Sequence, residues 1–173
     1  MFPIEHCIVA VIPIIAYVLV RDRDVPTGGF LAIVFVGSQL PDLVDKPLAH
    51  QFGLIPSGRV FVHSLPVAVP ILCLAGWYAW RTDRLRAGGA FAFAYLSHIV
   101  ADNRRVLSLP NPTLSDDMLW PFRPATPRPD VPYWAGEASI NVRLWTLFSA
   151  VVLAITVYYL YRDINEQLRS SAT

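Results

Sequence analysis

Five long runs of apolar residues, separated by charged or proline-rich segments, dominate this chain of 173 residues. They cover about residues 2–20, 28–41, 60–80, 87–101 and 142–161. A helix rises about 1.5 Å per residue, so about 20 apolar residues cross the hydrocarbon core of a bilayer; the second run is short for a full span. We therefore predict an all-α fold, a polytopic membrane helix bundle with about five transmembrane helices.

The composition supports a membrane protein. The chain is 54% hydrophobic and 16% charged, with a mean hydropathy of +0.44, whereas soluble domains contain about 25% charged residues. A net charge of +1 gives no electrostatic case for a nucleic-acid partner. Cys7 and Cys73 lie inside apolar runs without metal-binding spacing, so we expect buried thiols. We predict one integral membrane domain over residues 1–173.

The charged connections predict an orientation. An acidic residue opens the first run and charged residues follow it, so we expect a retained span and not a cleaved signal peptide. Arginines are concentrated in the short segments 21–27 and 81–86 and in the tail from residue 162. The positive-inside rule then predicts a multi-pass inner-membrane protein with a cytoplasmic tail. The N-terminus and a long proline-rich loop, residues 102–141, would lie on the extracytoplasmic face.

His98 and Asp102 stand four residues apart near the end of the fourth run. On a helix this spacing places two side chains on one face, with Cβ atoms about 5–6 Å apart. An imidazole and a carboxylate so placed can share a metal ion. The alternative is a partly buried histidine that is hydrogen-bonded to an aspartate at the end of a helix.

The alternation of spans brings further ionisable residues to the same membrane face. Such residues normally face the interior of a bundle and mark function, and His and Asp are ligands for zinc, manganese or a two-metal site. The alternative is that they only cap helix ends. The six residues are His6, Asp42, Asp45, His63, His98 and Asp102.

The same positions resemble the motifs of the YdjM-type family of inner-membrane, metal-dependent hydrolases. In order, they are His6, Pro41-Asp42-Leu-Val-Asp45, Gly58-Arg59-Val-Phe-Val-His63-Ser64, Ser97-His98-Ile-Val-Ala-Asp102 and Trp120-Pro121-Phe122. The family pattern has a histidine where this chain has Gly58. His50, in the preceding segment, is a candidate replacement; otherwise it is an exposed loop residue.

The resemblance implies a hydrolase that is distantly similar to zinc-dependent phospholipase C and related nucleases. It implies that the six residues bind one or more divalent ions, zinc or alternatively manganese. Asp45 would be either a bridging ligand or the general base. Arg59 would stabilise negative charge on the substrate; the alternative is an arginine that only extends to the interface.

The predicted position of the site, at the bilayer surface under a proline-rich loop, favours a lipid or another amphiphilic substrate. Trp120, Phe122 and Trp134 are candidate membrane anchors. The competing hypothesis is a non-catalytic membrane protein with a structural or sensing metal site. A transporter is disfavoured because the ligands lie at span ends and not at the midplane.

Overall fold

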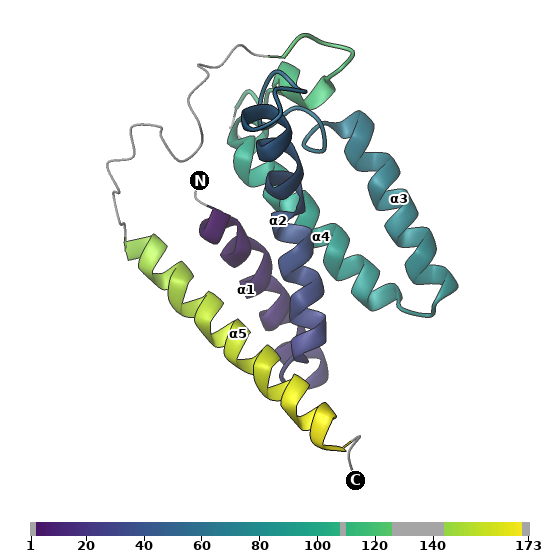
Figure 1. Ribbon diagram of the computed structural model, residues 1–173, viewed down its shortest axis with the longest axis vertical. Coiled ribbons are helices and arrows are strands. Elements are labelled where there is room, and N and C mark those ends of the chain that lie inside the picture. Colours follow the sequence, from purple (N-terminus) through teal and green to yellow (C-terminus); the bar gives the residue numbers. More distant parts are fainter. Residues whose placement is uncertain (1–2, 108–109, 126–143, 171–173) are drawn as a thin grey trace.

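The computed structural model describes residues 3–107, 110–125 and 144–170 (Figure 1). This part of the chain is helical and contains no strand, which confirms the predicted all-α class. Two short 3-10 helices, η1 and η2, lie between the fourth and fifth α-helices. In order, the elements are α1 (Pro3–Asp22), α2 (Gly28–His50), α3 (Leu65–Arg81), α4 (Leu85–Asp102), η1 (Arg104–Leu107), η2 (Asp116–Leu119) and α5 (Leu144–Ser170).

The helices pack around a core that α1, α2 and α4 share, with α3 against α4 and α5 against α1 and α2 (Figure 1). Small residues bring α2 and α4 close together. A Cβ atom added at Gly37 of α2 would lie 2.8 Å from the carbonyl oxygen of Phe91 and 3.1 Å from Cβ of Ala94. The buried core at this junction comprises Cys7, Ala10, Val11, Ile14, Leu31, Val34, Ala90 and Ala94.

The second helix is longer than predicted. The expected span ended at residue 41 and a loop was expected from Lys46, because proline removes a backbone donor and usually ends or kinks a helix. Instead α2 continues through Pro41 and Pro47 to His50. The helix ends where the backbone N–H groups of Gln51 and Phe52 both donate to the carbonyl of Pro47. The prediction of a loop over residues 46–50 was wrong.

The third helix begins later than predicted, at Leu65 and not at residue 60. The N–H groups of Phe61, Val62 and His63 donate to the carboxylate of Asp45, so they are engaged outside a helix. Pro66 then occupies the first turn of α3, where its missing N–H costs nothing. His63 therefore comes from a loop, which corrects its predicted position inside a span.

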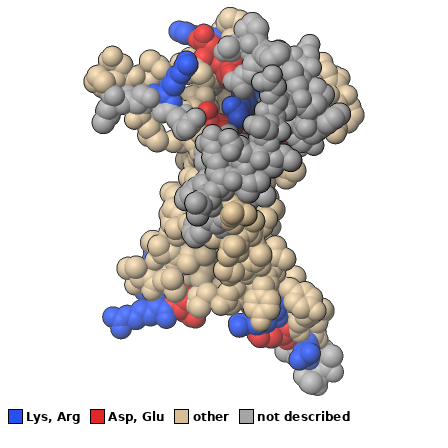
Figure 2. All heavy atoms as spheres, turned by 90° about the vertical axis from the view of Figure 1, so that its left-hand side faces the viewer, with Lys and Arg blue, Asp and Glu red and all other residues tan. Residues whose placement is uncertain are grey.

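One helix in the described residues, α2, is long and apolar enough to cross a membrane. The apolar α3, with 17 residues, is just shorter. Figure 2 shows that charged side chains gather at the two ends of the visible face, and that the described surface between them is largely uncharged. The number of about five transmembrane helices stays a prediction.

The proline-rich segment after α4 is only partly described. Its first part forms η1 and η2, and the ring of Trp120 contacts Phe61 edge-on, with ring centres 6.1 Å apart. Phe122 is 83% exposed, as a membrane anchor would be. Trp134 and most of the predicted loop beyond residue 125 lie outside the described residues.

Candidate metal centre

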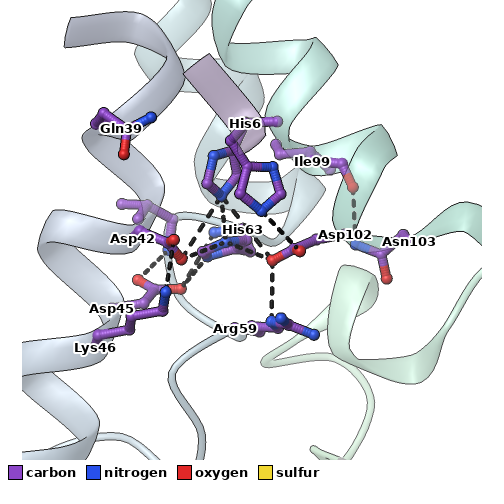
Figure 3. Close-up of polar contacts among 12 residues, drawn as sticks. His6, Gln39, Asp42, Asp45, Lys46, Arg59, His63, Ile99, Asp102 and Asn103 are labelled. Carbon is purple, nitrogen blue, oxygen red and sulfur yellow. Dashed lines mark hydrogen bonds and ion pairs between the residues drawn. The ribbon is translucent and has the colours of Figure 1, made fainter. Parts of the chain in front are cut away.

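The structure gathers the predicted site residues at one end of the bundle (Figure 3). They come from four parts of the chain: the start of α1, the second half of α2, the loop before α3 and the end of α4. Four of them, one from the loop and three from α2 and α4, offer ligand atoms that all lie within 4.8 Å of one another. These four are Asp42, His63, His98 and Asp102.

Asp45 fixes the loop that carries His63. Its Oδ1 accepts from the N–H of Val62 at 2.9 Å, and its Oδ2 accepts from the N–H of Phe61 at 3.0 Å. The same Oδ2 lies 2.8 Å from Nδ1 of His63. A carboxylate that already accepts backbone N–H groups acts as an acceptor here, so Nδ1 carries the proton and Nε2 points into the cluster.

These contacts give Asp45 a supporting role in the structure, and its predicted roles as bridging ligand or general base stay predictions. Both of its oxygens are engaged by donors, and it is not among the four residues whose ligand atoms converge. Its geometry matches that of a residue that orients a ligand histidine by accepting a hydrogen bond from the ring nitrogen that does not bind metal. We therefore interpret Asp45 as a positioning residue for His63.

His98 is oriented in the same way by the backbone of α2. Its Nδ1 lies 2.6 Å from the carbonyl oxygen of Ser38. A carbonyl can only accept, so Nδ1 donates and Nε2 is left with a lone pair. The side chain is buried, and Nε2 faces His63.

The two Nε2 atoms lie 3.1 Å apart. Because both Nδ1 atoms are donors, two neutral imidazoles would place two lone pairs against each other at this distance. A positive charge between them, either a proton or a metal ion, removes that repulsion. Oδ1 of Asp42 lies 3.7 Å from each Nε2 and, among the described residues, has no hydrogen-bond partner.

This arrangement fits a divalent metal ion. With ligand bonds of about 2.0–2.1 Å, the ligands of a tetrahedral zinc ion lie roughly 3.3 Å apart, close to the 3.1–3.7 Å separations among these three atoms. Asp102 supplies a fourth ligand atom, since its Oδ2 lies 3.6 Å from Nε2 of His63 and 4.0 Å from Nε2 of His98. Two imidazoles and two carboxylates are a donor set that suits zinc or manganese.

His6 lies beside this group and not in it. Its Nε2 is 3.1 Å from Oδ1 of Asp102, and its ring stacks on that of His98 with centres 4.0 Å apart. The side chain is fully buried, and Nδ1 has no hydrogen-bond partner in the described part of the chain. His6 can therefore orient Asp102 or serve a second ion, and its predicted role as a metal ligand stays a prediction.

Two cations border the cluster on the side that is partly open to solvent. Nε of Arg59 lies 2.9 Å from Oδ2 of Asp102, and Nζ of Lys46 lies 2.6 Å from Oδ2 of Asp42. Their side chains are 31% and 17% exposed. The sequence interpretation missed Lys46, although the i, i+4 spacing from Asp42 is the same signal that selected His98 and Asp102.

The charges around the cluster leave a deficit of positive charge. Three buried carboxylates, those of Asp42, Asp45 and Asp102, face the two fixed cations. Burying an uncompensated charge is costly, so the cluster favours one further cation. Burial lowers the pKa of His63, but its interactions with the carboxylates of Asp102, Asp45 and Asp42 raise it above its usual value.

Gly58 and His50 lie close together. A Cβ atom at Gly58 would lie 3.0 Å from Nε2 of His50 and 3.3 Å from Cγ of Lys46. The space beside Gly58 is thus taken by a histidine from the end of α2. His50 is exposed and is not one of the four residues whose ligand atoms converge. Its predicted role as a replacement for the family histidine stays a prediction.

Comparison with known proteins identifies the family. A family model described as YdjM inner membrane protein matches residues 1–166. The chain belongs to this family. No curated protein and no solved structure matches it. The match confirms the resemblance that was inferred from five short motifs, and it extends that resemblance through most of α5, which only hydropathy had predicted. In this YdjM family protein, the motif residues form the buried His/Asp cluster.

Proposed function

We propose that this YdjM family protein is a multi-pass, membrane-embedded metal-dependent hydrolase that cleaves a phosphoester of a lipid or another amphiphilic substrate. The observation that carries the proposal is the convergence of Nε2 of His63, Nε2 of His98 and Oδ1 of Asp42. Both histidines are oriented by hydrogen bonds at Nδ1, and Oδ1 of Asp42 has no hydrogen-bond partner among the described residues. Such a group costs free energy unless a cation joins it.

In this proposal Asp42, His63, His98 and Asp102 hold the ion. A bound zinc or manganese ion supplies a water of lowered pKa and polarises the phosphoester. Asp45 and the carbonyl of Ser38 keep the two imidazoles in the tautomer that binds metal. Metal ligands held in this way do not need to reorganise when substrate arrives.

Arg59 and Lys46 are placed to receive the anionic part of the substrate. Each uses one of its several N–H donors on an aspartate oxygen, so further donors remain for phosphate oxygens. Their partial exposure sets the open side of the cluster. A phosphoester entering there would meet positive charge first and the ligand group behind it.

The membrane context supports a lipid or other amphiphile as substrate. The family is one of inner membrane proteins, and α2, the helix with Asp42, is long and apolar enough to cross a bilayer. The exposed Phe122 and the Trp120–Phe61 contact place aromatic side chains near the site loop. The proposed topology puts this end of the bundle at the extracytoplasmic headgroup layer.

The test is hydrolysis by purified protein. The substrates are a chromogenic phosphodiester and a phospholipid in mixed micelles. We expect chelation to abolish activity, and zinc or manganese to restore it. Lys46→Gln should retain metal but lose about tenfold or more in kcat/KM, because a donor to the phosphate is removed. The matched control is Asp116→Ala, at an exposed carboxylate that pairs with Arg123.

A non-catalytic metal protein would give a different result. It would bind metal with the same residues and be stabilised by it, yet it would hydrolyse neither substrate. Activity that survives in the double variant His98→Ala, Asp102→Ala would also contradict the proposal, because the ligand group would then not be the source of the reaction.

A further inference from the structure

A second feature, at the opposite end of α1 and α4 from the metal centre, is a groove of about 590 Å³. This volume lies in the range of small-molecule sites. The walls are mostly apolar side chains, and two arginines complete them. The lining residues are Pro13, Ile14, Tyr17, Arg21, Phe30, Leu85, Arg86, Gly89, Ala90 and Phe93.

The groove follows the register of two helices. On α1 the wall is a row spaced by four residues, Pro13, Tyr17 and Arg21, and α4 supplies the facing row Leu85, Gly89 and Phe93. Eight residues of helix give each row a length of about 12 Å. The end of α1 meets the start of α4, because Arg86 pairs with Asp22, so both arginines lie at the same end.

The floor of the groove is open because of one glycine. A Cβ atom at Gly88 would lie 2.4 Å from Cβ of Ala79, so that residue packs against α3. A Cβ atom at the next residue, Gly89, would meet no heavy atom within 4 Å. The pair therefore serves two purposes: the first glycine permits close helix packing, and the second leaves room in the groove.

The charge in the groove is confined to its outer end. The side chains of Arg21 and Arg86 are 65% and 48% exposed. Asp22 neutralises one of them: it pairs closely with Arg86 and lies 4.0 Å from Arg21. The guanidinium of Arg86 lies 5.6 Å from the ring centre of Phe30. One positive charge is left in excess above an apolar channel.

We propose that this groove binds an anionic phospholipid, with its phosphate at Arg21 and Arg86 and an acyl chain between Tyr17 and Phe93. A free anion would use only the arginines and leave the apolar walls exposed, whereas an apolar chain alone would leave the charge unmatched. The chain belongs to a family of inner membrane proteins, so phospholipid surrounds the groove. The proposal is independent of hydrolase activity at the other end.

The experiment is native mass spectrometry of the purified full chain in detergent, titrated with phosphatidylglycerol or with phosphatidylcholine of the same acyl chains. Gly89→Trp should place a large side chain in the groove, since a Cβ atom there meets no heavy atom within 4 Å. Its control is Gly76→Trp on α3, where an added Cβ atom also meets nothing within 4 Å. Arg21→Gln with Arg86→Gln removes the charge, and Arg81→Gln, in the last turn of α3 and outside the groove, is the control.

We expect phosphatidylglycerol to bind the wild type and both controls alike. Binding should be about tenfold weaker in Gly89→Trp and in the double arginine variant, as for the loss of a charge-assisted contact. Equal binding of phosphatidylglycerol and phosphatidylcholine would overturn the proposal, as would wild-type binding by Gly89→Trp. Glycerol phosphate that displaces the lipid at equal concentration would show a site for the free anion and also overturn it. Metal content, measured on the same samples, reports separately on the metal centre.

Discussion

Asp45 and His63 lie 18 positions apart in the sequence, yet Oδ2 of Asp45 is 2.8 Å from Nδ1 of His63. The same carboxylate binds the backbone N–H groups of residues 61–63. One side chain on α2 thus shapes the loop and sets the tautomer of the histidine that it carries. The proposed metal centre depends on this contact although Asp45 itself is outside the ligand group.

Replacing Asp45 should weaken metal binding without removing it. In Asp45→Ala, His63 loses its orienting partner, so we expect zinc affinity to fall about 10–100-fold. The backbone donors of the loop lose their acceptor, which should lower the free energy of unfolding by about 1–3 kcal/mol. Calorimetric zinc titration and chemical unfolding measure the two effects, with Asp116→Ala as the control. Wild-type zinc affinity in Asp45→Ala would contradict the positioning role.

Metal affinity should rise with pH. Burial lowers the pKa of His63, but its interactions with the carboxylates of Asp102 and Asp45 outweigh burial and raise it, so we expect metal to displace a proton. We expect affinity to rise up to about tenfold per pH unit, the limit for one displaced proton, and to level off above the folded pKa of His63. Zinc titrations across this pH range measure the slope. A flat profile would contradict a protonated His63.

The stability of the metal-free protein should change in the opposite direction. A raised pKa contributes stability that is fully present below the unfolded value of about 6.5. This contribution is lost as the pH rises through the folded pKa of His63. Thermal unfolding in chelator should therefore show a falling Tm over that window, and His63→Gln should remove this component of the pH dependence.

Because α2 packs closely on α4, we expect alanine substitutions at two glycines of α2 to change the free energy of unfolding very differently. Gly37→Ala should destabilise the protein by about 1–3 kcal/mol, because the new methyl group would press on the backbone of Phe91. Gly29→Ala meets nothing within 4 Å and should be neutral or stabilising by about 0.5–1 kcal/mol. Unfolding of both variants in the same detergent measures the difference. Equal effects would contradict the packing.

The helices could be predicted from the sequence better than their ends could. Apolar runs located the five α-helices in the described part of the chain, because burial and lipid both require apolar side chains over many residues. The prolines at 41 and 47 suggested a helix end, but α2 continues through both. The late start of α3 depends on Asp45, a residue in another element, so no local pattern around residues 60–64 could reveal it.

The site could be predicted as a group of residues but not as a set of atoms. Alternating spans placed His6, Asp42, His63 and His98 at one end, and the structure brings them together. The division into ligands and supporting residues depends on contacts between distant segments, such as that of His98 with the carbonyl of Ser38. A backbone carbonyl has no sequence signature, so this contact required the structure.

Metal analysis of the purified protein is the most direct test of the proposed metal centre. Wild-type protein and the double variant His98→Ala, Asp102→Ala are equilibrated with zinc, freed of unbound ions and measured by elemental mass spectrometry, and circular dichroism checks that both are equally helical. We expect roughly one or more ions per chain in the wild type and none in the variant. Equal, negligible metal in two equally folded samples would contradict it.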